Sequence, residues 1–201
     1  RFKMKPIVQK SFMYIDECKT IEHYLDLRIK NGRAIKQRKN DDGLFFIIQG
    51  TALTDSVGLT YLPRVEEVLG KKLSLSTTGL RKWRKNTFQG WHKNHWSYEI
   101  VVSIQISDHM WPIGFLTELQ DHPWIEGQQN ADTVANCLQG DAVIFNGATT
   151  YHGRHRLQDD WCTTMQLYYV EKDSYTDKKD KRQLYGDENI TRSDEQVKVH
   201  A

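Results

Sequence analysis

The chain has 201 residues, of which 38% are hydrophobic, 27% charged and 11% aromatic, and its formal net charge is +2. That length lets a single domain bury a core without disulfides or a structural metal. The small net charge gives no indication of a nucleic-acid partner. No apolar run reaches the roughly 18 residues that predict a membrane span, and the N-terminus lacks the charged-then-apolar order of a secretory signal.

The three cysteines, Cys18, Cys137 and Cys162, lie far apart and include no CxxC pair. An odd number at such spacing argues against a disulfide framework and against a zinc knuckle. Unpaired thiols are typical of a reducing compartment, so we expect a cytoplasmic protein.

Residues 1–70 are expected to form a mainly helical support region with one or two strands. From Thr20 to Arg28, apolar residues recur at helical spacing. The run from Arg28 to Lys39 carries six basic residues, which predict a solvated helix face more readily than a phosphate-binding surface. Leu44 to Gln49 predicts a buried strand, and Thr60 to Leu69 predicts a short helix with a proline in its first turn.

Residues 71–170 change to a strand pattern and are expected to form the β-rich core. In residues 99–107, isoleucine and valine alternate with other side chains, which is the period of a strand. Further short strands are predicted at residues 142–145, 151–157 and 163–170, with turns at Gly140-Asp141 and Asn146-Gly147. Several short strands separated by turns favour a β-sandwich or a small barrel.

Residues 171–201 are almost wholly polar, with Asp, Lys, Glu and Arg dominating. Such a composition predicts a surface helix or a tail. The three regions together are expected to form one domain.

Two short segments hold four of the eight histidines: HKNH at residues 92–95 and TYHGRH at residues 150–155. Each adjoins a predicted strand, and imidazole on a strand is a well-directed ligand for iron, copper or zinc. Non-haem iron oxygenases place two histidines and one carboxylate on one face of the metal. The usual sequence form is His-x-Asp followed by a distant histidine. Here Asn94 stands in the position of the acid.

Three longer stretches surround these histidines. They read EVLGKKLSLSTTGLRKWRKNTFQGWHKNHWSYEIVVSIQISDHMWPIGF from Glu67, then LQGDAVIFNGATTYHGRHRL, then TTMQLYYVE. In this order they resemble a group of iron/2-oxoglutarate dioxygenases related to the prolyl hydroxylase and phytanoyl hydroxylase families. The resemblance spans residues 67–170. It is most specific at Gly70, Leu73, Arg81, His92, Ser97, Glu99, Ile100, Trp111-Pro112-Ile113, Gly140-Asp141, Gly147, His152, Arg154 and Gln166.

This resemblance implies a mainly β (α+β) fold, a double-stranded β-helix or jelly roll with supporting N-terminal helices. It also implies that His92 and His152 bind Fe(II), with Asn94 at the position of the liganding aspartate. The implied activity is hydroxylation of an unactivated C–H bond in a small-molecule or peptide substrate, and neither the substrate nor the oligomeric state is indicated.

The implied co-substrate is 2-oxoglutarate. Arg81 and Trp83 match an R-x-Y strand whose aromatic residue often contacts 2-oxoglutarate in the family. Arg154 matches an arginine two residues beyond the second histidine, and on an extended strand Arg156 would share its face. Any of these three arginines can hold a carboxylate with two parallel hydrogen bonds.

The sequence departs from the family pattern at three places. Asn94 is a neutral amide, which is a weaker iron ligand than a carboxylate. Trp83 replaces the tyrosine of the family, so a phenol hydrogen bond is lost. Many relatives carry an Arg or Lys about ten residues after the second histidine, and positions 160–166 hold none.

These departures leave other functions open. The chain can be a non-catalytic binding module that keeps the barrel without the iron. It can be a halogenase-like enzyme, in which loss of the carboxylate lets chloride bind the metal, or a three-histidine iron enzyme in which a turn brings His95 to the site. A cupin-like metal protein accounts for His152 but not for the long gap between Glu99 and Gly140.

Several other polar and aromatic residues are expected to have structural roles. Glu99 is interpreted as a supporting residue, and Asp141 as a turn residue. His109 and His122 are predicted to face solvent. Core packing is predicted for the tryptophans near the site: Trp91, Trp96 and Trp111.

Overall fold

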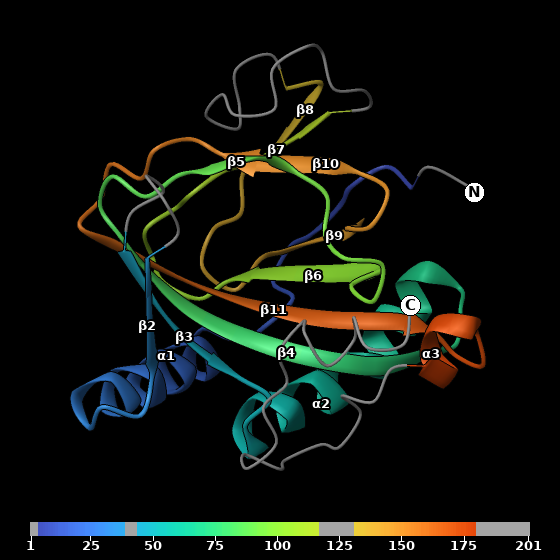
Figure 1. Ribbon diagram of the computed structural model, residues 1–201, viewed down its shortest axis with the longest axis horizontal. Coiled ribbons are helices and arrows are strands. Elements are labelled where there is room, and N and C mark those ends of the chain that lie inside the picture. The colour runs from blue at the N-terminus through green and yellow to red at the C-terminus, as the bar shows by residue number, and fades with distance from the viewer. Residues whose placement is uncertain (1–3, 39–43, 117–130, 180–201) are drawn as a thin grey trace.

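Two antiparallel sheets face each other in the computed structural model, which describes residues 4–38, 44–116 and 131–179 (Figure 1). The elements are β1 (Ile7–Gln9), α1 (Ile15–Lys30), β2 (Ile35–Arg38), β3 (Leu44–Gln49), α2 (Ala52–Leu69), β4 (Leu73–Arg84), β5 (Gln89–His92), β6 (Ile100–Gln105), β7 (Ile113–Leu116), β8 (Thr133–Ala135), β9 (Ala142–Asn146), β10 (Tyr151–Arg154), β11 (Trp161–Glu171) and α3 (Tyr175–Lys179).

The larger sheet has seven strands in the order β1-β9-β6-β11-β4-β3-β2, and the smaller has four in the order β5-β10-β7-β8. Helices α1 and α2 lie against the outer side of the larger sheet, and the smaller sheet faces its inner side (Figure 1). This arrangement confirms the predicted mainly β fold with helical support from the N-terminal region. None of the helices in the described part of the chain is long and apolar enough to span a membrane.

The long pairing of β4 with β11 determines which side chains enter the space between the sheets. Trp161 pairs with Arg84 at one end and Glu171 with Leu73 at the other, and the register shifts between Tyr168 and Tyr169. Tyr168 and Tyr169 are consecutive strand residues, so their side chains leave the sheet on opposite faces. Tyr169 donates to the Gly58 carbonyl of α2 at 2.7 Å, whereas Tyr168 packs in the core between the sheets.

Both helices extend further than the sequence pattern predicted. The apolar stripe of Thr20 to Arg28 lies within α1. Helix α2 begins at Ala52, where Thr51 forms a capping box with Thr54. The proline predicted in a first turn, Pro63, therefore lies inside α2, and that prediction was wrong because the cap nine residues before Thr60 was overlooked.

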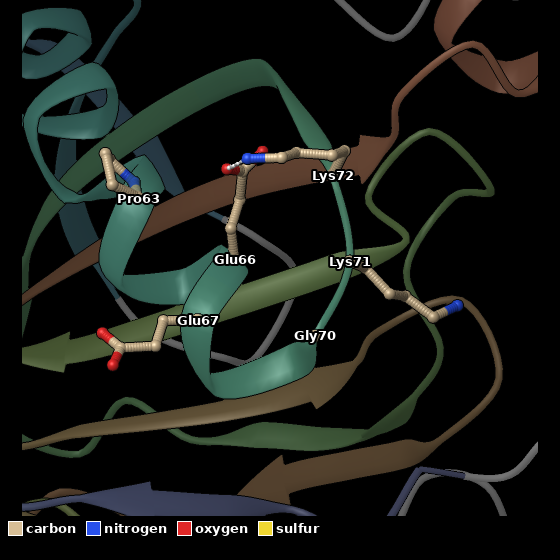
Figure 2. A pocket seen from close by; sticks show the side chains of 6 residues that line it. All are labelled: Pro63, Glu66, Glu67, Gly70, Lys71 and Lys72. Carbon is tan, nitrogen blue, oxygen red and sulfur yellow. Dashed lines mark hydrogen bonds and ion pairs between the residues drawn. The ribbon is translucent and has the colours of Figure 1, made fainter.

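The C-terminus of α2 is held by paired charges. Gly70 ends the helix in the left-handed conformation at φ 63°. The Glu66 carboxylate lies 2.8 Å from the Lys72 ammonium, and Figure 2 shows Lys71 pointing away from this pair. The Lys71 ammonium lies 2.9 Å from the Glu171 carboxylate. A pocket of about 340 Å³ lies here. Its charged groups stabilise the end of the helix, and the pocket is on the outside of α2, away from the space between the sheets.

The basic run that follows α1 does not continue as a helix. Helix α1 ends at Lys30, Gly32 adopts a positive φ of 65°, and Ile35 to Arg38 form β2 at the edge of the larger sheet. The prediction of a helix face from Arg28 to Lys39 was therefore wrong beyond Lys30. The glycine stops the helix, and pairing with β3 supplies the backbone hydrogen bonds that a helix would otherwise provide.

Candidate metal and co-substrate site

The two candidate iron ligands lie directly opposite each other in the smaller sheet. His92 is the last residue of β5, His152 is the second residue of β10, and the two are Cα partners in the antiparallel register. Their ring centroids are 4.2 Å apart. The structure therefore brings together the two histidines that are sixty positions apart in the sequence.

Each imidazole is oriented by a backbone carbonyl two residues earlier. Nδ1 of His92 lies 2.8 Å from the carbonyl oxygen of Gly90, and Nδ1 of His152 lies 3.0 Å from that of Thr150. A carbonyl only accepts, so Nδ1 carries the proton in both rings and the lone pair is on Nε2. Supporting hydrogen bonds of this kind orient metal-binding histidines in many proteins.

Burial keeps His152 in the neutral form that binds metals. Its side chain is enclosed, and desolvation, reinforced by the neighbouring His92 and Arg154, holds the pKa of His152 well below its usual range. A histidine must be unprotonated to coordinate a metal, so this site needs little proton release on metal binding.

Asn94 lies two residues beyond His92 and is attached to the turn that leads into β10. Its backbone N–H donates to the Gly147 carbonyl at 2.8 Å, and its Nδ2 lies 2.6 Å from the position that a Cβ on Gly147 would occupy. The Gly147 N–H in turn donates to the Glu99 carbonyl at 2.9 Å. Asn94 therefore has a fixed backbone beside the histidine pair, and it contributes a neutral amide.

The other candidate ligands are engaged elsewhere. The His95 Nδ1 lies 2.9 Å from the Ser97 hydroxyl, and its ring lies against Trp96. The Glu99 carboxylate accepts the backbone N–H of Glu171 at 3.5 Å. Within residues 4–38, 44–116 and 131–179, no three His, Cys, Asp or Glu side chains are close enough to hold a metal together. The structure thus offers no support for the three-histidine alternative.

Arg154 extends into the space between the sheets. It is buried, its Nη1 donates to the carbonyl of Trp111, and its Nη2 donates to the Ser103 hydroxyl at 3.2 Å. The guanidinium also lies over the Trp111 ring, 4.9 Å from the centroid. Burial lowers the pKa of Arg154, yet a guanidinium stays charged in proteins. Among the described residues, no carboxylate forms an ion pair with it.

Arg81, on β4 of the larger sheet, belongs to the same polar network as Arg154. Its Nη1 donates to the Gln166 amide oxygen and lies 3.3 Å from the Tyr168 hydroxyl. The Gln166 amide nitrogen donates to Ser103 at 3.5 Å, and Ser103 also accepts from Arg154. Two cations therefore share one network between the sheets. Ser103 and Tyr168 were not predicted, because their positions depend on long-range strand register.

The other two candidate co-substrate residues differ in their placement. Trp83 is buried, donates from Nε1 to Thr164 at 2.9 Å and packs edge-on against Trp111, so it closes the inner core beside Arg154. Arg156 instead donates to the Asn86 carbonyl at 2.8 Å and lies over the Phe88 ring. Strand β10 ends at Arg154, so the predicted shared face does not reach Arg156, and its proposed place beside Arg154 was wrong.

The remaining predictions were structural. Trp91 and Trp111 are buried, as predicted, whereas Trp96 is only half-buried. Asp141 holds the turn by accepting the N–H groups of Ser11 and Leu138, also as predicted. The side chain of His109 is 36% exposed. His122 lies outside the described residues.

Several solved structures have a similar fold. SnoK, a non-haem α-ketoglutarate-dependent carbocyclase from nogalamycin biosynthesis, is 9% identical with a TM-score of 0.65, over 85% of this chain and 81% of SnoK. HygX from Streptomyces hygroscopicus, solved with nickel, 2-oxoglutarate and hygromycin B, is 11% identical with a TM-score of 0.58, over 84% and 83%. A Pseudomonas putida prolyl-4-hydroxylase is 9% identical with a TM-score of 0.58, over 83% and 92%.

By sequence, neither a family model nor a curated protein matches the chain. The similarity to these structures is a similarity of backbone fold. Sequence identities near one residue in ten leave few side chains in common. The two facing sheets of this chain therefore form the jelly-roll fold of the iron/2-oxoglutarate oxygenases.

Proposed function

We propose that the protein is an Fe(II)/2-oxoglutarate-dependent oxygenase that oxidises a C–H bond of a small molecule or peptide. One observation carries the proposal: β10 holds His152, paired with His92, and two residues later Arg154, a buried cation with no carboxylate partner among the described residues. Residues two apart on a strand project to the same side, about 6.6 Å apart along it. A metal-binding residue, His152, and an anion-binding residue, Arg154, thus lie within the length of one small bound molecule.

The residues present fit a divalent metal together with a dianion. Both imidazoles have their Nδ1 positions committed to carbonyls, so their Nε2 atoms are suited to coordination. Asn94 adds no negative charge, and the buried Arg154 adds a positive one. Buried charges are stabilised only when they are paired. A doubly charged acid that chelates the metal supplies the missing negative charge, and 2-oxoglutarate is such an acid.

The comparisons support the same pair of ligands. The related structures include SnoN with Fe³⁺ and α-ketoglutarate, and HygX with nickel and 2-oxoglutarate. In this chain His92, His152 and the Asn94 amide oxygen would hold the metal, and Arg154 would hold the distal carboxylate of 2-oxoglutarate. When bound, Fe(II) and 2-oxoglutarate supply dioxygen activation coupled to oxidative decarboxylation of the co-substrate.

The protein itself contributes binding, orientation and exclusion of water. Trp83 and Trp111 pack against each other beside Arg154 and keep solvent from the guanidinium, which strengthens its attraction for a carboxylate. The Trp111 carbonyl and Ser103 fix the plane of the guanidinium. A fixed plane favours the two-pronged geometry in which arginine binds carboxylates most tightly.

One observation favours a second candidate, a non-catalytic protein that retains the fold and binds a dicarboxylate. Asn94 occupies the position of the acid, and the described residues offer no carboxylate beside the two histidines. In that case Arg154 still binds its anion, but iron binds weakly or not at all.

The two candidates are separated by an anaerobic titration with Fe(II) and then with 2-oxoglutarate. The oxygenase is expected to give the weak visible charge-transfer band of the iron–oxo-acid chelate and to retain iron by elemental analysis, and His152→Ala is expected to lose both. Binding of 2-oxoglutarate without the band and without retained iron would establish the non-catalytic protein instead.

A further inference from the structure

A second polar cluster lies between the sheets; it is joined to Arg154 through Ser103 and supplies none of the candidate metal ligands. It consists of Arg81 and Thr77 on β4 and Gln166 and Tyr168 on β11, and we refer to it as the Arg81 cluster. We propose that the Arg81 cluster binds a carboxylate of the oxidisable substrate, so that the substrate is a carboxylic acid. This inference rests on the proposed function, whose metal and co-substrate occupy the neighbouring site.

The backbone of β4 is shaped to hold the Arg81 guanidinium against the sheet. Residues 77, 79 and 81 project to the same face of the strand. A Cβ on Gly79 would lie 2.7 Å from the Arg81 Nη1, so only glycine leaves the side chain of Arg81 room to fold back along β4. The guanidinium is thereby brought to Gln166 and Tyr168.

Thr77 supplies a hydroxyl group that forms no hydrogen bond with the described residues. It is fully buried, and its Oγ1 has no hydrogen-bond partner. Thr77 is the register partner of Tyr168, so the two side chains are on the same side of the sheet as the Arg81 guanidinium. A buried hydroxyl without a partner destabilises the fold, because its lost hydration is not replaced. A ligand oxygen that accepts its proton removes this cost.

The Arg81 cluster adjoins both the histidine pair and Arg154. Tyr168 belongs to the same core group as Phe145, and the Phe145 ring lies 4.8 Å from that of His152. On the other side, Ser103 joins Gln166 to Arg154, which the Trp111 carbonyl also holds. A co-substrate that extends from the metal to Arg154 therefore leaves the charge of Arg81 without a counterion. A second anion close to the metal, where oxidation takes place, provides it.

Solvent reaches the Arg81 cluster from outside. Arg81 and Gln166 lie on the two central strands of the larger sheet and face the smaller sheet, yet both side chains are half-buried and not enclosed. The neighbouring inner residues Thr77 and Thr164 are buried. The cluster thus has an exposed arginine end, where an acid can enter, and an enclosed threonine end.

The test uses the protein loaded with Zn(II), which does not turn over, and with saturating 2-oxoglutarate. Trifluoroacetate serves as the smallest carboxylate probe, and its binding is followed by ¹⁹F NMR relaxation. Binding is expected in the wild type and is expected to weaken at least about 10-fold in Arg81→Gln, because a charge-assisted hydrogen bond is lost. Circular dichroism checks that the variant is folded.

Thr77→Val distinguishes a ligand-binding role from a structural one. The variant removes only a hydroxyl that has no partner, so its Tm is expected to equal or exceed that of the wild type, while trifluoroacetate affinity falls about 2- to 10-fold. Thr163→Val is the matched control, since Thr163 is a buried threonine whose register partner Lys82 faces α1. It is expected to leave the probe's affinity unchanged.

Competition identifies the kind of acid. N-acetylglycine is expected to displace the probe and N-acetylglycinamide is not; a pentapeptide that competes only with a free C-terminus would assign the carboxylate to a peptide end. The proposal is overturned if Arg81→Gln binds the probe like the wild type, or if 2-oxoglutarate itself displaces the probe. If 2-oxoglutarate does not bind but trifluoroacetate binds in an Arg81-dependent way, the proposed oxygenase function is contradicted. The proposed carboxylate site at Arg81 is then still supported.

Discussion

Asn94 and Gly147 are in close contact, through a 2.8 Å backbone hydrogen bond and through the Asn94 Nδ2, which lies 2.6 Å from where a Cβ of Gly147 would be. This contact fixes Asn94, the proposed third ligand, relative to the turn that leads into His152. The position of the proposed donor therefore depends on a glycine, and its chemistry on an amide.

Replacing Gly147 with alanine is expected to displace the Asn94 side chain. The added methyl group would lie 2.6 Å from both Asn94 Nδ2 and Val101 Cγ2 and 2.9 Å from the Tyr98 carbonyl oxygen. Overpacking of this kind typically costs about 1–3 kcal/mol. We expect a lower free energy of unfolding and weaker Fe(II) binding, measured by urea denaturation and by metal titration. Unchanged values for both would show that the turn adapts.

Asn94→Asp is expected to tighten Fe(II) binding. A carboxylate offers a charged oxygen in place of an amide oxygen, and we expect about a 10-fold or larger gain in affinity. Anaerobic titration with Fe(II) measures this, and 2-oxoglutarate consumption reports whether turnover rises with it. A variant that binds iron no better than the wild type would remove Asn94 from the ligand position.

Arg154→Gln is expected to abolish tight 2-oxoglutarate binding. Loss of a buried charged donor costs roughly 3 kcal/mol, which is about 100-fold in Kd. The fold should not suffer equally, because the variant also removes a buried cation without a carboxylate partner in the described chain. Calorimetry with Zn(II)-loaded protein measures the affinity. Arg156→Gln is the matched control, and an equal loss there would contradict the assignment to Arg154.

Asp141 makes the fold sensitive to acid. Burial raises its pKa, but Lys10 at 2.7 Å and the N–H groups of Ser11 and Leu138 outweigh this, and the pKa of Asp141 lies below its ordinary value. Its stabilising contribution is therefore complete above the unfolded pKa of about 4 and is lost as the pH falls through the lower folded value.

The Asp141→Asn variant tests this contribution. Denaturation curves of wild type and variant should differ most near pH 7 and converge toward pH 3, because protonation removes the same charge from the wild type. A difference that stays constant over this range would assign the effect to packing and not to charge.

Local patterns in the sequence predicted some elements well and others poorly. The apolar run from Leu44 to Gln49 is the strand β3, with the same bounds. Strand β4 reads LSLSTTGLRKWR, and its apolar alternation stops after Leu75, because the inner face beyond it carries the polar residues of the Arg81 cluster. A strand that lines a polar site loses the period by which strands are recognised.

In the candidate site, too, some residues were placed correctly from the sequence and others were not. The resemblance to a family placed His92, His152 and Arg154 correctly in one neighbourhood. Alternation alone also placed Arg156 there, and it failed because β10 ends at Arg154. The link between Arg81 and Arg154 through Gln166 and Ser103 depends on pairing among β4, β11 and β6, and nothing local in the sequence encodes such a register.

Strand β10 is paired on both sides, with β5 at His152 and with β7 from Tyr151 to Gly153. On the proposed function, the interval between His152 and Arg154 on β10 sets the length of acid that reaches both the metal and the guanidinium. Oxo-acids with one methylene group fewer or more than 2-oxoglutarate are then expected to bind more weakly. Selectivity for chain length would thus come from a backbone spacing.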